Sequence, residues 1–406
     1  MPDQSMAAIA LIITDKEKKM KQVYVDVAGR MHSLYKMLMK YPPEGYQFIT
    51  NGTRWDELSN AIVGSNGIYS LQDQVLSRII PVNLAKAYLE QLKKPPKGTD
   101  LTYATGQLVF RKEPWVVDLE YVTQLAGYSI KHFKRYRGII EKTLASDYCK
   151  KITSVTEAGI KTVLLNLDTA ELADKVEVIR PAIPKRNFTK DYNKDKVRLL
   201  FVGSANISGN FRVKGGGEVL EAFAILHQSY PNLELVSRSD VPDELKTKYK
   251  GLDNLTLGEV VPPKQLEEDF TSSDIFLFPS HATPAFAILD AMSYELPVIT
   301  TDVWANPELI ENGKTGFIIK KSEKIKHCVE NLIPDWSSPH NLRAYATPDP
   351  KVVKELVEKT RILIEDEKLR RRMGAAGRQE VENGKFSIKK RNETLKRIFD
   401  EATVES

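Results

Sequence analysis

Cysteine is scarce in this sequence, because its 406 residues include only Cys149 and Cys328. Two cysteines exclude a disulfide framework and a cysteine-rich zinc site, and they are typical of a protein from a reducing cytoplasm. The six histidines have no metal-ligand spacing, and no Asp-x-Asp motif occurs. We therefore expect no divalent metal and no bound cofactor.

Long apolar runs are also missing, since no segment reaches the roughly 18 apolar residues that a membrane-spanning helix needs. The run Met6–Thr14 is apolar but stops at Asp15, and it has neither a basic leader nor a clear small-residue cleavage site. We interpret it as an exposed or strand-like start rather than a signal peptide. A cytoplasmic protein that is not integral to a membrane is expected.

Neither sign of charge dominates, and a net charge of +5 does not argue for nucleic acid as a partner. One stretch is denser in basic side chains, which alternate with aromatic ones. The basic cluster consists of Lys131, Lys134, Arg135 and Arg137, with Phe133 and Tyr136 between them. It is either a solvated helix face or a contact with anionic lipid headgroups or a phosphate-bearing acceptor, which would attach the protein to the inner membrane face.

Short β-rich runs alternate with helical runs along the whole chain, which predicts an α/β fold with doubly wound parallel sheets. The polar segment 184–196 carries many charges and lacks apolar periodicity, so it is the best linker candidate. We predict a first Rossmann-like domain over residues 1–190 and a second over 191–386. A cleft between two such halves is the expected place for a ligand.

A strand, a glycine-punctuated loop and a lysine before a helix form the most informative segment. The apolar run Leu199–Val202 predicts a buried strand that ends at Gly203, and Lys214 precedes three glycines and a helical pattern. Unpaired N–H groups at the helix start, together with Lys214 and Arg212, would make an anion site. An ordinary α/β loop is the alternative interpretation.

A second helix start follows the apolar run that ends in Ser280. Phe286 and Ala287 would open this helix, and their N–H groups could support a second anion contact. Asp290 lies in the first turns, where a carboxylate could accept hydrogen bonds from ribose hydroxyls. A residue favoured only by the helix dipole is the alternative for Asp290.

Four segments of the second half occur in a distinctive order. They are FVG followed by KGG and a helix, LGEVVPPKQLEEDFTSSDIFLFPS, LDAMSYELPVITTDVWANPELIENGKTGFII, and RRMGAAGR in a late helix. In this order they resemble the donor-binding domain of the retaining GT-B glycosyltransferases of family 4, the glycosyltransferase group 1 domain. The resemblance implies the GT-B fold, in which two Rossmann-like domains face across a cleft and a C-terminal helix, here about 387–406, returns to the first domain.

The resemblance also implies a reaction. A sugar would pass from a nucleotide-diphosphate donor, which is a co-substrate, to a glycan, glycolipid or other hydroxyl acceptor with retention at the anomeric carbon. Lys214 takes the role of the cation that offsets charge on the diphosphate leaving group, and Asp290 matches the acid that holds the ribose. Backbone groups around Val261 and Pro262 match the turn that frames the base. The departing phosphate itself would take the acceptor proton.

Several positions depart from the family pattern, among them Glu295, where a small residue is customary, and Asp290, where a glutamate is customary. The arginine that usually follows FVG is Ser204 here, so we expect Arg212 to substitute for it. The first acid of the family's pair is Ala282, and we expect its neighbours His281 and Thr283 to take part of its contacts with the donor sugar. These departures leave open a catalytically weak or inactive sugar-nucleotide-binding protein or partner subunit.

The first half resembles the family's acceptor domain less closely. Gly29 follows the first predicted strand and would neighbour the donor phosphates. Glu120 stands where the family often has a histidine near the reacting sugar, and Asp118 faces the same side of the predicted strand. Either both carboxylates serve the acceptor hydroxyl, or one is simply a residue at a strand end.

A different sugar-nucleotide enzyme on the same architecture is a further alternative. An epimerase or a phosphorylase-like enzyme would also bind a sugar nucleotide or sugar phosphate, but no cofactor lysine for a phosphorylase is identifiable. A nicotinamide-dependent dehydrogenase is disfavoured because no G-x-G-x-x-G follows the first predicted strand.

Overall fold

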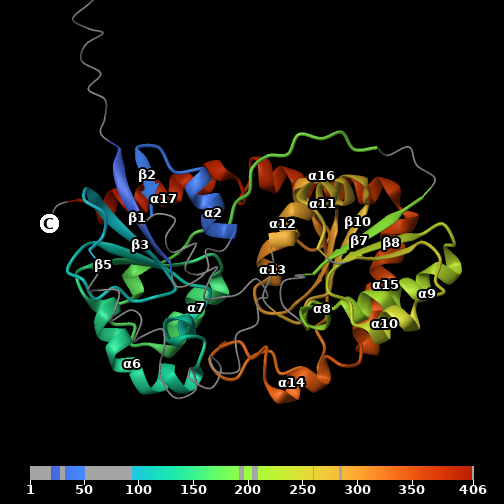
Figure 1. The fold of residues 1–406 in the computed structure, drawn as a ribbon, viewed down its shortest axis with the longest axis horizontal. Coiled ribbons are helices and arrows are strands. Elements are labelled where there is room, and N and C mark those ends of the chain that lie inside the picture. Colours follow the sequence, from blue (N-terminus) through green and yellow to red (C-terminus); the bar gives the residue numbers. More distant parts are fainter. Residues whose placement is uncertain are drawn as a thin grey trace, which may run out of the picture.

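A computed structural model of the chain describes residues 20–27, 33–50, 94–191, 196–203, 209–258, 260–282 and 286–404. These residues form two lobes that lie side by side, each built around a parallel sheet of six strands (Figure 1). The fold class predicted from the sequence is confirmed. We call the lobe that contains the earlier strands the first lobe and the other the second lobe.

The first lobe contains sheet A, whose strands follow the order β2-β1-β3-β4-β5-β6. The strands are β1 (Lys21–Val27), β2 (Tyr46–Ile49), β3 (Thr99–Thr105), β4 (Trp115–Asp118), β5 (Cys149–Ser154) and β6 (Val176–Val178). The helical elements described with them are α2 (Ser33–Lys40), η1 (Val122–Ala126), α6 (Ile130–Ala145), α7 (Glu157–Asn166) and η2 (Ala173–Lys175). Each neighbouring pair of strands is parallel, so their carboxyl ends meet at one edge.

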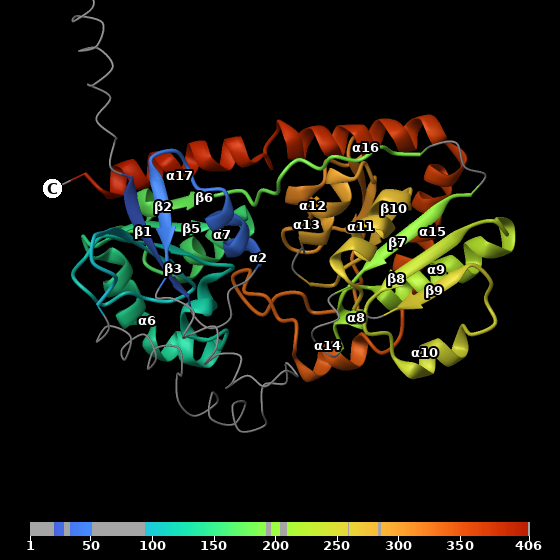
Figure 2. The ribbon, with the colours of Figure 1, turned by 45° about the horizontal axis from the view of Figure 1, so that its top comes forward.

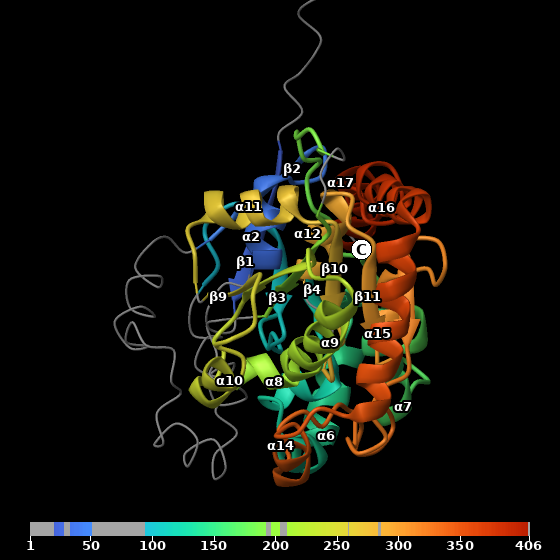
Figure 3. The same cartoon turned by 90° about the vertical axis from the view of Figure 1, so that its right-hand side faces the viewer.

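The second lobe contains sheet B, with the order β12-β11-β10-β7-β8-β9. Its strands are β7 (Arg198–Val202), β8 (Glu234–Arg238), β9 (Leu255–Gly258), β10 (Ile275–Phe278), β11 (Val298–Thr301) and β12 (Gly316–Ile319). Its helices are α8 (Asn210–Val213), α9 (Gly216–Ser229), α10 (Asp243–Lys248), α11 (Pro263–Ser272), α12 (Phe286–Ser293), α13 (Asn306–Leu309), α14 (Pro339–Ala344), α15 (Pro350–Glu365) and α16 (Glu367–Glu382). Helices α9 and α15 pack together on one face of this sheet (Figure 3).

The last helix returns to the first lobe. Helices α16 and α17 (Ile388–Ala402) lie in a row that spans both lobes (Figure 2). Leu395, Ile398 and Phe399 on α17 are buried in the same apolar cluster as Val23 and Val25 of β1. Because burial of apolar side chains is the main stabilising contribution to a core, α17 stabilises the first lobe.

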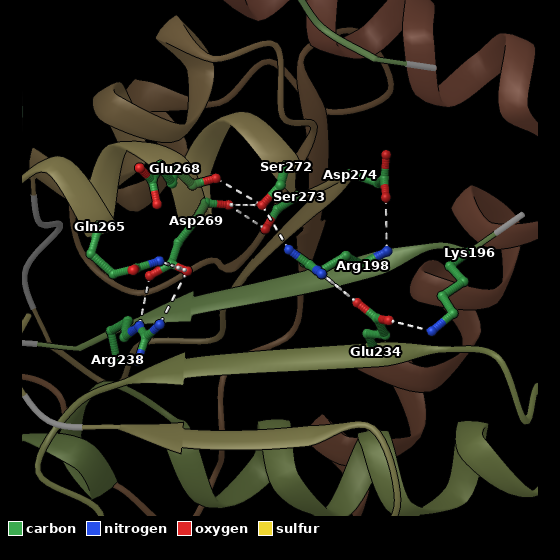
Figure 4. Close-up of polar contacts among 10 residues, drawn as sticks. All are labelled: Lys196, Arg198, Glu234, Arg238, Gln265, Glu268, Asp269, Ser272, Ser273 and Asp274. Carbon is green, nitrogen blue, oxygen red and sulfur yellow. Dashed lines mark hydrogen bonds and ion pairs between the residues drawn. The ribbon is translucent and has the colours of Figure 1, made fainter. Parts of the chain in front are cut away.

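A charged pair fixes the outer strands of sheet B to α11. Arg238 at the end of β8 makes a two-point contact with Asp269 of α11, with N···O distances of 2.6 and 3.1 Å (Figure 4). A side chain at Gly258 would place its Cβ 2.4 Å from the guanidinium nitrogen, so the absence of a side chain there leaves room for Arg238. The pair holds the end of β8 against α11, the helix that begins directly after Val261 and Pro262.

Candidate functional site

The strand order of sheet B predicts a crevice at the carboxyl ends of β7 and β10. The chain runs outward from β7 through β8 to β9 on one side and from β10 through β11 to β12 on the other. Such a reversal leaves neighbouring strand ends uncovered, and ligands of open α/β sheets bind there. Gly203 ends β7, and Pro279 and Ser280 follow β10 at this point.

The loop that carries Lys214 is packed tightly against the end of β10. Gly215 adopts a left-handed φ of +80°, and a Cβ on it would lie 2.3 Å from the carbonyl oxygen of Pro279. Only glycine fits this close approach, which brings the start of α9 to the crevice. The ammonium of Lys214 lies 5.7 Å from the centre of the Phe278 ring. The structure therefore places Lys214, the start of α9 and the end of β10 together.

The ammonium of Lys214 is affected electrostatically by the opposite lobe. Desolvation lowers the pKa of its ammonium to about 8, and the carboxylate of Glu120 in the first lobe opposes this change. Both side chains remain partly exposed, so they line an accessible region rather than a closed core. Residues 214 and 120 were predicted on separate halves of the chain, and the structure brings them within electrostatic reach of each other.

His281 lies behind the lysine loop and is 1% exposed. Its Nε2 lies 2.9 Å from Glu218 Oε1 in the first turn of α9, and its backbone N–H donates to the carbonyl of Val213 at 2.9 Å. Glu218 also accepts a hydrogen bond from the backbone N–H of Asp349. The sequence analysis missed Glu218, because an acid in a first helical turn is common and its buried histidine partner is distant in the chain.

Arg212 is bound to two other segments of the second lobe. Its guanidinium donates to the carbonyl of Ala346 at 2.6 Å and pairs with Glu244 of α10 at 2.5 Å. Of the two basic residues in this loop, Lys214 is therefore the one whose pKa is affected by a carboxylate of the first lobe.

Asp290 lies in α12 and pairs with Arg186 of the segment that joins the lobes, at 3.0 Å. Burial raises the pKa of its carboxyl, and Arg186 counteracts part of this rise. Phe286 and Ala287 begin α12 and are partly buried, whereas Ala282 is buried. The predicted residues Gly29, Ser204 and Thr283 lie outside the described residues.

The first lobe contributes a buried acid and a more accessible one at the end of β4. Asp118 is 2% exposed and accepts hydrogen bonds from the Tyr35 hydroxyl at 3.0 Å and the Thr153 hydroxyl at 2.9 Å. Desolvation raises the pKa of Asp118 to about 7, although both hydrogen bonds favour the ionised form. Glu120 is partly exposed and accepts a hydrogen bond from the Tyr128 hydroxyl at 3.3 Å.

Further contacts join the lobes near these strand ends. Glu308 of α13 accepts hydrogen bonds from two backbone N–H groups at the start of α7 and pairs with Arg180. Asn166 of α7 and Asn331 exchange hydrogen bonds at 3.1 and 3.3 Å. Ile333 is buried in the apolar cluster of the first lobe, although it follows the strands of sheet B in the chain.

The basic cluster lies on α6. Lys131, Lys134, Arg135 and Arg137 are exposed, and two of them have acidic partners. Lys134 pairs with Glu330 at 2.8 Å, and Arg137 pairs with Glu141 at 2.8 Å. These pairs reduce the positive charge that the cluster presents.

Two features are absent from the part of the chain that the structure describes. Within it, no helix is long and apolar enough to cross a membrane. The described residues also contain no group of three or more histidine, cysteine, aspartate or glutamate side chains that could hold a metal ion.

Comparison with known proteins identifies the second lobe more closely than the first. Residues 196–335 match the family described as Glycosyl transferases group 1. The chain is 31% identical over 147 residues to spore coat protein SA of Bacillus subtilis, covering 33% of this chain and 38% of that protein. It is 28% identical over 200 residues to the capsular polysaccharide biosynthesis glycosyltransferase CapM of Staphylococcus aureus, covering 48% of this chain and 44% of that protein. The chain thus spans less than half the length of these curated relatives.

Solved structures match nearly the whole chain in fold. A glycosyltransferase from Rickettsia africae superposes with a TM-score of 0.57 at 16% identity, covering 95% of this chain and all of that one. The Anabaena protein HepE, solved in complex with UDP-glucose, gives a TM-score of 0.56 at 15% identity, covering 94% of this chain and 99% of that one. At such low identity these similarities establish the shared two-lobed fold.

Proposed function

Because residues 196–335 belong to the Glycosyl transferases group 1 family and the chain has the GT-B fold, we propose that this protein transfers a sugar from a nucleotide-diphosphate donor to a hydroxyl acceptor, with retention at the anomeric carbon. The observation that carries the proposal is the position of Lys214. Its ammonium lies beside the start of α9 and 5.7 Å from the centre of the Phe278 ring at the end of β10, and it is affected electrostatically by Glu120 of the other lobe.

In the proposed reaction the bond between the anomeric carbon and the donor phosphate breaks, and negative charge accumulates on the diphosphate. Lys214 and the N–H groups at the start of α9 would stabilise this charge more in the transition state than in the ground state. A diphosphate beside Lys214 would also raise the pKa of its ammonium again, since an anion favours the charged form. The acceptor oxygen then bonds to the anomeric carbon, and its proton passes to the departing phosphate.

The other predicted residues would hold the two substrates in place. We propose that Asp290 holds the ribose, that Val261 and Pro262 frame the base, and that Glu120 serves the acceptor hydroxyl. Arg212 would have to exchange its contacts with Ala346 and Glu244 to reach a diphosphate, so we assign it a secondary role in leaving-group stabilisation.

His281 and Asp118 are buried, and we propose that they act by position. His281 would fix the lysine loop to the loop after β10, and Asp118 would support the end of β4 that carries Glu120. Gly29, Gly203, Ser204, Thr283, Phe286 and Ala287 are proposed to line the donor site.

A thermal-shift screen against nucleoside diphosphates and their sugars tests the donor site. We expect at least one nucleoside diphosphate to raise the melting temperature of the protein and Lys214→Ala to abolish most of that shift. Lys314→Ala is the matched control, because Lys314 is an exposed lysine of the same lobe that pairs with Glu311. If the Lys214 and Lys314 variants respond alike, the assignment of Lys214 is wrong.

Transfer itself is tested with the nucleotide sugar that binds. Turnover of Lys214→Ala is expected to fall more than about tenfold, because a charge-assisted contact worth roughly 1.5–3 kcal/mol is lost. NMR of the product reports whether the anomeric configuration is retained. Donor binding without turnover over a broad acceptor panel would instead support a sugar-nucleotide-binding protein or partner subunit, and the residues to examine first would be Ser204 and Ala282.

A further inference from the structure

Three aromatic rings form a row across the boundary between the lobes. Tyr121 and Tyr128 follow β4 in the first lobe, and Trp304 follows β11 in the second. The ring centres of Tyr121 and Tyr128 lie 5.3 Å apart, and those of Tyr121 and Trp304 lie 6.0 Å apart, both in edge-to-face geometry. The row therefore lies where the carboxyl ends of both sheets meet, on the same side as Glu120.

Both outer rings of the row are fixed at two points. Tyr128 and Trp304 adopt left-handed backbone conformations, with φ of +61° and +47°, which are uncommon for large side chains. The Tyr128 hydroxyl donates to Glu120 at 3.3 Å, and the Trp304 indole N–H donates to the carbonyl of Leu332 at 3.2 Å. Strained backbone of this kind concentrates at ligand-binding positions, where the surrounding structure holds it in place.

Tyr128 nevertheless remains 49% exposed. The backbone conformation and the hydroxyl bond already fix the position of this exposed ring. It therefore presents a preorganised apolar surface, which a ligand can cover at low cost in conformational entropy. A carboxylate at the tip of the ring adds a hydrogen-bond acceptor beside that surface.

We propose that Tyr128 and Glu120 form a subsite for a pyranose ring of a saccharide acceptor. The C–H groups on one face of a sugar ring would pack on the Tyr128 ring, and a hydroxyl at the ring edge would donate to Glu120. This inference rests on the proposed function, because the ring row places Tyr128 and Glu120 at the boundary with the second lobe, so a sugar held there would lie next to the lobe that binds the donor. It adds to that function the chemical class of the acceptor: the protein would recognise a sugar ring of the acceptor molecule.

A membrane surface is the competing occupant, because the basic residues Lys131 and Arg135 follow Tyr128 closely in the chain. The chemistry of the pair favours the sugar. The Tyr128 hydroxyl donates a hydrogen bond to the carboxylate of Glu120. This negative charge would repel anionic headgroups, whereas the hydroxyl groups of a sugar could donate hydrogen bonds to it.

Saturation-transfer NMR with methyl pyranosides tests the subsite on the full chain. The probes are the methyl glycosides of glucose, galactose, mannose and N-acetylglucosamine, added together with a nucleoside diphosphate. Tyr128→Ala is expected to weaken binding of the preferred glycoside about tenfold, and Tyr128→Phe, which keeps the ring, only about two- to threefold.

Tyr148→Ala is the matched control. Tyr148 is a 39% exposed tyrosine of the same lobe, but its carbonyl accepts from Trp115 at the opposite edge of sheet A. We expect this variant to bind glycosides like the unmodified protein. Folding of each variant is checked by its melting temperature, and the thermal shift with nucleoside diphosphates should survive in all three.

The outcomes separate the two proposals. If no methyl glycoside binds, or if Tyr128→Ala binds glycosides as the unmodified protein does, the subsite is refuted while donor binding still stands. Loss of binding to anionic vesicles in Tyr128→Ala with unchanged glycoside binding would also overturn it, in favour of a membrane contact. A subsite that behaves as expected in a protein that binds no nucleoside diphosphate would contradict the proposed function instead.

Discussion

The carboxylate of Glu308 in the second lobe caps the helix that begins at Glu157 in the first. Its two oxygens accept hydrogen bonds from the backbone N–H groups of Glu157 at 2.7 Å and Ala158 at 2.8 Å, and it also pairs with Arg180. Carboxylates are favoured at helix N-termini because they satisfy unpaired N–H groups and oppose the positive end of the helix dipole. A single side chain thus connects the two lobes at three points.

Removal of this carboxylate should weaken the contact between the lobes. We expect Glu308→Ala to lower the free energy of unfolding by about 1–3 kcal/mol, because two N–H groups and a partly buried guanidinium lose their partner. Chemical denaturation measures the loss. Glu311→Ala, which removes an exposed acid three residues further along the chain, should change stability by less than about 0.5 kcal/mol. Equal effects of both variants would contradict the role assigned to Glu308.

Activity should depend on pH through Lys214. Its pKa is lowered to about 8, so the ammonium of the free protein loses its proton as the pH rises through that value. If the charged form stabilises the leaving group, kcat/KM should fall above about pH 8. The corresponding limb of kcat should lie at higher pH, because a bound diphosphate favours the charged form. A flat profile between pH 7 and about 9.5 would argue against a catalytic role for this lysine.

Stability should depend on pH through Asp118. Its folded pKa of about 7 lies above the ordinary value of 3.8, so the native state binds its proton more tightly than the unfolded state does. The resulting stabilisation is complete below about pH 4 and is lost as the pH rises to about 7. Asp118→Asn removes this titration, so its stability relative to the unmodified protein should improve from pH 4 to pH 8. Denaturation curves at several pH values measure the difference, and a constant difference would show that Asp118 is not protonated in the native protein.

The sequence predicted those parts of the site that lie within one strand-loop-helix unit. Gly203, Lys214 and the start of α9 are close in the chain, and apolar periodicity and glycine spacing are local signals. The order of strands in sheet B then brought β10 beside β7, as parallel α/β topology requires.

Contacts between distant segments could not be predicted in this way. Ile333 lies in the apolar core of the first lobe, yet nothing in its own segment, VENLIPDW, relates it to the strands of that lobe. Glu308 lies in the motif NPELI, and Thr156 is the N-cap of α7, but no periodicity relates a carboxylate to a helix start about 150 residues earlier. The same holds for Asp290, whose partner Arg186 lies in the segment predicted as a linker.

Asp290 should matter for the nucleotide more than for the fold. It is a partly exposed carboxylate near the crevice, and its pair with Arg186 is also partly exposed, so its loss should cost little stability. We expect Asp290→Asn to weaken binding of the nucleoside diphosphate about tenfold, since a charged acceptor for ribose hydroxyls is lost. Calorimetric titration measures the affinity, with Arg186→Gln as the control for the ion pair alone. A lowered melting temperature with unchanged nucleotide affinity would identify Asp290 as structural.

The basic cluster on α6 should confer salt-sensitive binding to anionic membranes. Four exposed cations on one helix attract anionic headgroups, but Lys134 and Arg137 already pair with acids of the protein. We therefore expect co-sedimentation with phosphatidylserine-containing vesicles at about 0.05 M salt and its loss at about 0.5 M, where the Debye length is only a few ångströms.

The double variant Lys131→Glu with Arg135→Glu should abolish binding at low salt. The double variant Lys94→Glu with Lys97→Glu is the control, because these two exposed lysines before β3 lie in the same lobe. It changes the net charge as much as the first double variant does, and it should leave binding to vesicles in place. Equal loss in both double variants would mean that net charge alone drives association, and no sedimentation with vesicles at low salt would leave α6 as a solvated face.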